Sequence, residues 1–313
     1  MQRIGAGLGV VLLTGAAIAG AFLVHRRAAE SPIDVDLTAV RGESEEPDPE
    51  TLNLAVAPIF LPRSTIGDYE LLAEYLTSRV GRPFRLVQRK TYGEVNELLR
   101  RGTVAVAFIC SGAYIEARQN RIPLAEIALP VIKGRTDYNS VFIVRSASPY
   151  RTIHELEGKS FAFTDPLSLS GHLYPHWLLL EEERDPGTFF KRTIFSYSHD
   201  ASIGAVANGT VDGAAVDSIV FDWEVAGKPE LKSALRVIHT SAPLPFAPIV
   251  TPASLPSRTR DLIATALLAM PDSEDGRMVL RKLQIDGFRA PDPDSYDLVI
   301  AIHDRVGRHL RTR

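Results

Sequence analysis

The sequence predicts an α/β protein with two lobes and a ligand cleft between them, preceded by one N-terminal hydrophobic helix. Two observations predict this fold class. From residue 52 onward, short apolar segments alternate with segments whose apolar residues recur at helical spacing, which is typical of βα units in a mostly parallel sheet. The length of 313 residues also suits two domains plus a short extra segment.

Composition limits the possible classes of function. The chain is 45% hydrophobic and 23% charged, so the bulk of it can bury a core and is not disordered. The net charge is −3, and residues 1–30 hold three Arg and one Glu, which leaves −5 for the rest, opposite in sign to most nucleic-acid-binding proteins. Cys110 is the only cysteine, which excludes an intramolecular disulfide and a cysteine-rich zinc site.

Residues 1–30 are predicted to be a signal-anchor or a signal peptide. Residues 4–24 carry no charge, and a helix of that length would measure about 32 Å, enough to cross a hydrocarbon core of about 30 Å. A cleaved signal peptide would use the small residues at 17–19 or 19–21 as its cleavage site. The length of the run favours an anchor, which would hold the body on the periplasmic side of the inner membrane. Cleavage would instead release the body into the periplasm.

Residues 31–51 are predicted to be an acidic, disordered linker. Seven acidic residues oppose the single arginine Arg41, and three prolines interrupt the segment. Such a composition cannot bury enough apolar area to fold, so the linker spaces the globular body from the membrane.

The body follows in a regular order. A strand over 52–57 ends at Pro58, and a helix over 69–80 is followed by Gly81 as a candidate C-cap. Thr91 and Glu94 fit a capping box at the start of the next helix, which stops at Gly102. Further strands are predicted over residues 84–88, 104–110, 124–132, 140–145, 160–163, 194–197 and 214–216. Further helices are predicted over residues 172–183, 201–208, 258–270, 277–284 and 296–310.

The strongest candidate site follows the strand over 160–163. Ser168, Ser170 and Gly171 lie in the turn between this strand and the next helix. The serines supply hydroxyl donors, the glycine lets a ligand approach the backbone, and the helix start supplies free N–H groups, an arrangement that suits an anion. The alternative is a serine that only caps the helix, which is common in proteins without a ligand there.

Two further junctions have the same form. His199 lies between a strand and a helix, where its ring could donate to an oxyanion, and a surface or capping histidine is the alternative. Ser111 could cap the helix after the strand 104–110, while the Tyr114 hydroxyl could reach a ligand or its ring could simply pack. Ligands of open α/β sheets bind at the carboxyl ends of strands, so these junctions are where binding residues are expected.

Signatures of enzymes are missing from the sequence. There is no Gly-x-Ser-x-Gly elbow, Walker loop or dinucleotide glycine fingerprint, so no catalytic residue and no cofactor are predicted. His172 and His176 have i,i+4 spacing but lack the zincin glutamate, so no metal site is predicted.

Taken in order, these junctions resemble the phosphate, phosphite and phosphonate substrate-binding proteins of ABC transporters, from about residue 52 to residue 296. The motifs that carry the resemblance are, in chain order, Ala57-Pro58, Thr91 to Asn96, Ser111 to Tyr114, Tyr138 to Val141, Asp165 to Gly171 and Ser198 to Asp200. The resemblance implies a type II periplasmic binding protein, which has two Rossmann-like α/β lobes. Proline and glycine content shifts near residues 133–140 and 242–247, which predicts lobe 1 as 52–135 plus 246–313 and lobe 2 as 136–245.

In this family the phosphorus oxyanion is held between the lobes by the serine loop, the histidine and tyrosines. The resemblance implies ligand contacts from Tyr92, Tyr114, Ser168, Leu169, Ser170, Gly171, His199 and Asp217. Leu169 stands where the family often has threonine, which removes a hydroxyl donor. Asp217 matches one of two acidic positions of members that bind an aminophosphonate, whereas Ala247 occupies the other.

The predicted function is therefore an extracytoplasmic solute-binding protein without catalysis. Its ligand is a small oxyanion, a phosphonate, phosphite or phosphate, that it delivers to an ABC transporter permease, and residues 4–24 contact the membrane. No nucleic-acid partner is predicted. The alternative is a ligand-sensing module of the same fold that signals to a membrane kinase or cyclase partner, and an enzyme acting on a small heterocycle comes third.

Overall fold

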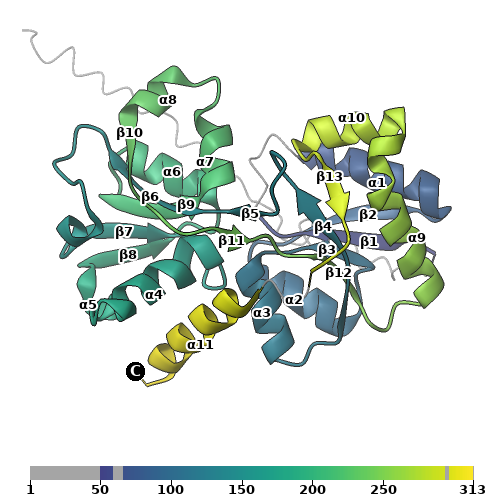
Figure 1. Cartoon of the computed structure of the whole chain (residues 1–313), viewed down its shortest axis with the longest axis horizontal. Coiled ribbons are helices and arrows are strands. Elements are labelled where there is room, and N and C mark those ends of the chain that lie inside the picture. The colour runs from purple at the N-terminus through teal and green to yellow at the C-terminus, as the bar shows by residue number, and fades with distance from the viewer. Residues whose placement is uncertain (1–49, 59–65, 293–295, 313) are drawn as a thin grey trace, which may run out of the picture. The chain divides into compact units, whose positions relative to one another are not determined.

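The chain is described by a computed structural model over residues 50–58, 66–292 and 296–312 (Figure 1). The predicted N-terminal helix, both candidate cleavage sites and residues 31–49 of the linker lie outside these ranges. Within them, no helix combines the length and the hydropathy that a membrane crossing requires.

Two sheets organise the described residues. The first has six strands in the order β13 (Gly287–Arg289), β4 (Leu124–Val131), β12 (Ile249–Pro252), β3 (Val106–Phe108), β1 (Leu52–Val56) and β2 (Phe84–Gln88). The second has five, in the order β10 (Leu235–Thr240), β6 (Ser140–Arg145), β9 (Gly213–Asp217), β7 (Ser160–Phe163) and β8 (Arg192–Phe195). Figure 1 shows the two sheets side by side, each with its own helices.

The chain passes between the sheets twice. It leaves the first sheet after β4 and returns to it before β12, and on the way β5 (Asp137–Tyr138) pairs with β11 (Leu244–Pro245) in a short antiparallel ladder. Tyr138 stacks on Phe246 across this ladder, with ring centroids 5.4 Å apart and planes within 2°. The two crossing segments are therefore joined to each other by hydrogen bonds and by ring stacking between the two sheets.

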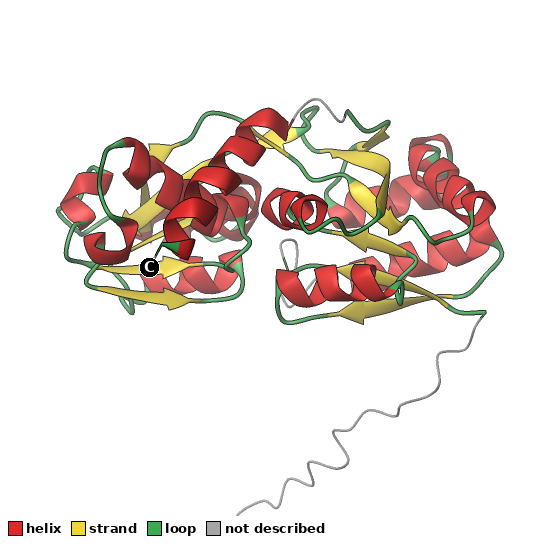
Figure 2. Cartoon of the chain, turned by 90° about the horizontal axis from the view of Figure 1, so that it is seen from below, coloured by secondary structure: helices red, strands yellow, loops and turns green. Residues whose placement is uncertain are grey.

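The helices follow the strands as the sequence pattern predicts. Those associated mainly with the first sheet are α1 (Ile66–Val80), α2 (Tyr92–Arg101), α3 (Ser111–Gln119), α9 (Ser257–Leu268), the 3-10 turn η3 (Met270–Asp272) and α10 (Glu274–Leu283). Those of the second are the 3-10 turn η1 (Ile153–Leu156), the π-helical turn η2 (Leu169–Leu173), α4 (Tyr174–Glu181), α5 (Pro186–Phe189), α6 (His199–Ala207), α7 (Ser218–Val225) and α8 (Pro229–Ala234). Helices flank both sheets in the view of Figure 2.

Local sequence signals explain where several helices begin and end. Thr91 accepts from the Glu94 N–H while the Glu94 carboxylate accepts from the Thr91 N–H, so the predicted capping box is present at α2. Gly102 ends α2 in the left-handed conformation, with φ of 65°.

Side chains from one strand cover both faces of the second sheet, because successive residues of a strand point to opposite faces. Phe142 of β6 packs on one face with Phe161, and Val141 packs on the other face with Ile203.

The last helix, α11 (Asp297–Arg311), does not stay with one sheet. His303 lies 2.8 Å from the Glu116 carboxylate of α3, and His309 lies 3.2 Å from Asp185 at the start of α5. α11 also packs along α4. The sequence-based division assigns residues 246–313 wholly to lobe 1, but α11 contacts elements of both halves, and its assignment to lobe 1 alone stays a prediction.

The expected α/β class with two sheets is confirmed, but the expected mostly parallel arrangement is wrong. β1 pairs in parallel with β2 and β3, and β7 pairs in parallel with β8 and β9. The strands at the crossings, β12 and β6, pair antiparallel with their neighbours. A strand that enters a sheet from the other half runs against strands laid down by local βα units, so the two crossings make both sheets mixed.

Candidate ligand-binding site

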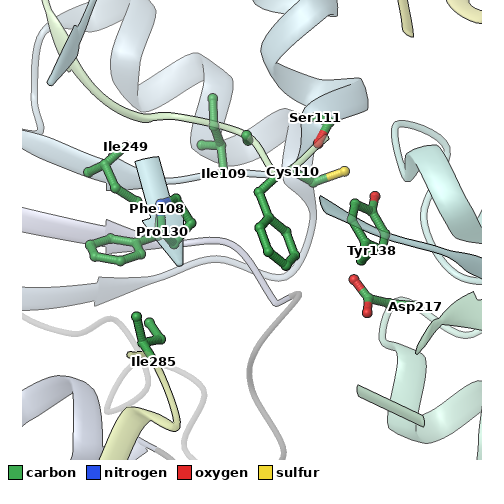
Figure 3. Close-up of a pocket in the computed structure, with 11 residues that line it drawn as sticks. Phe108, Ile109, Cys110, Ser111, Pro130, Tyr138, Asp217, Ile249 and Ile285 are labelled. Atoms are coloured by element: carbon green, nitrogen blue, oxygen red, sulfur yellow. The ribbon is translucent and has the colours of Figure 1, made fainter. Parts of the chain in front are cut away.

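A narrow cavity lies where the two sheets and the crossings meet (Figure 3). The first sheet and the segments beside it contribute Phe108 to Ser111, Pro130, Ile249 and Ile285. The crossings contribute Tyr138, Phe246 and Ala247, and the end of β9 in the second sheet contributes Asp217. No lysine or arginine is among these lining residues of the described chain. About 20 Å³ is open to the centre of a water molecule, roughly what one buried water needs.

The serine loop joins β7 to α4 beside this cavity. Ser168 accepts a hydrogen bond from the Gly171 N–H at 3.0 Å, so it caps the π-helical turn η2 as the sequence suggested. A Cβ on Gly171 would overlap the Thr164 hydroxyl and lie 2.6 Å from the Thr164 Cβ. Only glycine therefore lets the loop fold this tightly against the end of β7.

His199, at the start of α6, has its protonation fixed by its neighbours. The Asp217 N–H donates to His199 Nδ1 at 3.1 Å, and the Thr164 hydroxyl lies 3.2 Å from the same nitrogen. Because a backbone N–H can only donate, Nδ1 must be the acceptor and the ring proton must sit on Nε2. Burial lowers the pKa of His199 to about 3, so the ring is neutral and offers one N–H donor.

Asp217 closes β9 and opens α7. Its Oδ1 accepts from the Ile219 N–H at 2.6 Å and from the Val220 N–H at 3.3 Å. Burial raises the pKa of Asp217 to about 7, and these two hydrogen bonds oppose the rise. Near neutral pH this carboxyl is therefore partly protonated, and Oδ2 is the atom through which it can act on a ligand.

Two tyrosines lie with this group. Burial raises the pKa of Tyr138, and hydrogen bonding with the Ser170 and Ser111 side chains opposes this rise. The Tyr92 hydroxyl is fully buried and has no hydrogen-bond partner among the described residues. Burial, followed by the nearby Cys110 thiol, raises the pKa of Tyr92. A buried hydroxyl without a partner is costly, so this orphan is a mark of a binding site.

Backbone donors from both halves converge on Cys110. The N–H groups of Leu169, Ala113 and Gly112 lie against its sulfur, but burial dominates and raises the pKa of this thiol to about 11. The thiol itself lies 3.6 Å from the Leu167 carbonyl. The N-terminus of α3 and the serine loop thus point N–H groups at the same place, the arrangement that favours an anion.

The two halves touch directly at this point. The Tyr92 N–H donates to Asp165 Oδ2 at 3.1 Å, while Asp165 Oδ1 accepts from the Leu167 N–H. Gly112 of α3 packs on the serine loop so closely that a Cβ there would overlap the Leu167 carbonyl oxygen. These contacts join elements of the first sheet to the loop of the second and hold the cavity closed.

Comparison with known proteins identifies the group to which this architecture belongs. The profile of the family described as "ABC transporter, phosphonate, periplasmic substrate-binding protein" matches residues 54–296. The chain belongs to this family of phosphonate-type substrate-binding proteins.

Similar proteins include one from Mycolicibacterium smegmatis and one from Escherichia coli. This binding protein is 33% identical over 196 residues to the phosphate-import protein PhnD of Mycolicibacterium smegmatis, covering 59% of this chain and 60% of that protein. It is 32% identical over 161 residues to the phosphonates-binding periplasmic protein of Escherichia coli, covering 50% of this chain and 47% of that protein. The matched region therefore spans about half of each of these relatives.

The fold agrees with solved structures of the same kind. PhnD1 of Prochlorococcus marinus, solved with methylphosphonate, superposes with a TM-score of 0.76 over 83% of this chain and all of that one, at 18% identity. This likeness shows that the substrate-binding protein has the fold of type II periplasmic binding proteins.

Several sequence-predicted site residues of the binding protein come together. Tyr92, Ser170, His199 and Asp217 lie around one polar cluster, and Gly171 and Ser168 shape the loop that carries Ser170. The Leu169 side chain instead packs in the hydrophobic core, while its backbone N–H faces Cys110. The hydroxyl that threonine would add at 169 would therefore start from a core-facing position.

Tyr114 is placed apart from this cluster. Its hydroxyl is bonded to the Glu126 carboxylate and to Arg118, and its ring packs on Tyr296 at 5.0 Å. Tyr138 takes the position in the cavity that the sequence analysis gave to Tyr114. The sequence signal for Tyr138 is its place at the predicted crossing, within the motif from Tyr138 to Val141. Cys110 and Ser111 also line the cavity, although the sequence predicts no ligand contact for either.

Proposed function

We propose that this protein binds a small phosphorus oxyanion between its two halves and presents it to the membrane components of an ABC transporter, without catalysing a reaction. The observation that carries the proposal is a group of neutral donors at and beside one cavity. The Tyr138 and Ser111 hydroxyls line the cavity. The Ser170 hydroxyl, the orphan Tyr92 hydroxyl and the neutral His199 ring lie next to these lining residues. Neutral donors of this kind can surround an oxyanion without a permanent positive charge.

Removing the Ser170 hydroxyl is expected to weaken methylphosphonate binding about 10-fold or more. A hydrogen bond to a charged group contributes about 1.5–3 kcal/mol, and each 1.4 kcal/mol is tenfold in affinity. Ser170→Ala and wild type would be compared by isothermal titration calorimetry. Ser160→Ala is the matched control, since that hydroxyl bonds Asp212 at the opposite end of β7. Equal affinities for Ser170→Ala and wild type would remove the serine loop from the site.

We further propose that the body is tethered to the outer face of the inner membrane through residues 4–24. The support is the uncharged length of this run. Mass spectrometry of protein purified from the membrane fraction should recover peptides that contain Phe22 to Arg26. A mature N-terminus at Gly20 or Phe22 would show that the segment is a cleaved signal peptide.

A further inference from the structure

A second hollow, separate from the ligand cavity, is lined by residues of both α7 and α10. About 460 Å³ of it is open to the centre of a water molecule, which is within the size range of small-molecule sites. Among the described residues, the two spaces share only Ile285. The charged and aromatic lining residues include Arg277 and Arg281 of α10, Trp223 of α7 and Lys133, which follows β4. We call this hollow the arginine groove.

Two arginines on one face of α10 have no acidic partner. Arg277 and Arg281 lie four residues apart, so their side chains are neighbours on the helix surface. Arg277 donates to the Pro271 carbonyl at 2.9 Å, and neither guanidinium forms an ion pair with another described residue. Like charges at this spacing repel each other. A ligand with two anionic groups would replace this repulsion by attraction.

The other charged groups at the groove are already engaged. Lys133 Nζ lies 2.8 Å from Asp222 Oδ2, so these two charges offset each other. Asp286, the one acidic lining residue of the described chain, accepts the Gly134 N–H through Oδ2 at 2.7 Å. The two arginines therefore face a single carboxylate, and the groove keeps a net positive charge.

Apolar side chains line the groove beside the arginines. Ile132, Leu280 and Ile285 are buried lining residues, and the Trp223 indole is partly buried against the core. Aliphatic side chains and an indole offer a flat aromatic ring both apolar contact and ring packing. The groove thus combines an apolar surface with two unpaired cations.

We infer that the arginine groove is a second binding site, for a small aromatic dicarboxylate. Each guanidinium can hold one carboxylate through two parallel hydrogen bonds, while the ring of the ligand packs on Trp223. One guanidinium for each group matches the single charge of a carboxylate. The inference goes beyond the proposed function and does not depend on it, because no described polar residue lines both the groove and the ligand cavity.

Calorimetric titration of the wild-type protein with four probes tests the inference. Isophthalate has a ring and two carboxylates, benzoate has a ring and one, glutarate has two carboxylates and no ring, and benzyl alcohol has a ring without charge. Isophthalate is expected to bind with a dissociation constant of about 1 mM or lower, and about 10-fold or more tightly than benzoate or glutarate. Benzyl alcohol should show no measurable binding.

Each part of the inference can fail in this series. Isophthalate binding no tighter than benzoate would remove the pair of arginines, and binding no tighter than glutarate would remove the ring. The titration is repeated with saturating methylphosphonate, and displacement of isophthalate would place that ligand in the cavity and overturn the inference. Absence of isophthalate binding up to about 10 mM would also overturn it.

A substitution on α10 locates the site. Arg281→Gln should weaken isophthalate binding about 10-fold or more, because one carboxylate loses its charged partner. Lys282→Gln is the matched control, since Lys282 is the next residue of α10 and is also exposed but does not line the groove. Both variants should bind methylphosphonate like wild type. Isophthalate affinity equal in Arg281→Gln and Lys282→Gln would overturn the inference.

Tryptophan fluorescence provides a second readout. The chain has two tryptophans, Trp223 in the groove and Trp177 on α4. Isophthalate should change the fluorescence of the wild type, and the change should disappear in Trp223→Phe and persist in Trp177→Phe. A fluorescence change that persists in Trp223→Phe would show that the ring binds elsewhere.

Discussion

Replacing Gly112 by alanine is expected to weaken methylphosphonate binding at least 100-fold while the protein stays folded. A Cβ at this position would overlap the Leu167 carbonyl oxygen and lie 3.0 Å from Leu173 Cδ1. Both neighbours belong to the serine loop segment of the other half, so the clash acts on the approach of the two halves and not on the packing of either. The Gly112→Ala protein can relieve this clash if its two halves move apart.

An open protein offers the ligand donors from only one half. It would lose the hydroxyls of Tyr92 and Ser111, and two hydrogen bonds to an anion together contribute about 3–6 kcal/mol, which corresponds to more than 100-fold in affinity. Small-angle scattering should show that saturating methylphosphonate compacts the wild type but not Gly112→Ala. The thermal midpoint without ligand should not fall, because alanine favours a helix over glycine.

Gly93→Ala is the matched control for this experiment. Gly93 is also in the first turn of a helix, α2, but an added Cβ there would meet nothing within 4 Å. It should bind and compact like wild type. If Gly112→Ala also binds within threefold of wild type and compacts equally, the contact between Gly112 and Leu167 does not govern closure.

Replacing Asp217 by asparagine is expected to make the protein more stable than wild type at neutral and alkaline pH. Burial raises the pKa of Asp217 to about 7, against an ordinary value of 3.8. The folded protein therefore holds this proton more tightly than the unfolded chain. The stabilisation of the folded protein by this bound proton is complete below about pH 4 and is lost as the pH rises through about 7.

The size of this loss of stability follows from the rise in the pKa of Asp217. About three pKa units at 1.36 kcal/mol each correspond to about 4 kcal/mol of stability lost between pH 4 and pH 8. Asparagine keeps the oxygen that accepts the Ile219 and Val220 N–H groups but does not ionise. The difference in unfolding free energy between variant and wild type, measured by urea denaturation, should therefore grow by about this amount across that range.

Asp212→Asn is a control of opposite sign. Hydrogen bonds from the Ser160 hydroxyl and N–H lower the pKa of Asp212, so its stabilising effect is present above about pH 4 and lost as the pH falls through the lowered value. This variant should be less stable than wild type at neutral pH and approach it in acid. Parallel pH profiles for Asp217→Asn and wild type would show that the carboxyl at 217 is not held in its protonated form.

Local features of this protein were determined by the sequence itself. The capping box of Thr91 and Glu94, the left-handed Gly102 and the serine cap at Ser168 each involve residues within a few positions of one another. Their hydrogen bonds depend on backbone geometry over one helical turn, which the residue pattern encodes directly. The serine loop and the position of His199 at a helix start were predictable for the same reason.

Only the tertiary structure decided which of these groups meet. His199 Nδ1 receives its proton donor from Asp217, 18 residues away, and the Tyr92 N–H is paired with Asp165, 73 residues away. Tyr114, three residues after Ser111 on the same helix, hydrogen-bonds to Glu126 on β4, whereas Tyr138 at the crossing lines the cavity. Pairings of this range depend on how the two crossings bring the sheets together, and that packing is set by the burial of apolar residues from the whole chain rather than by any one segment.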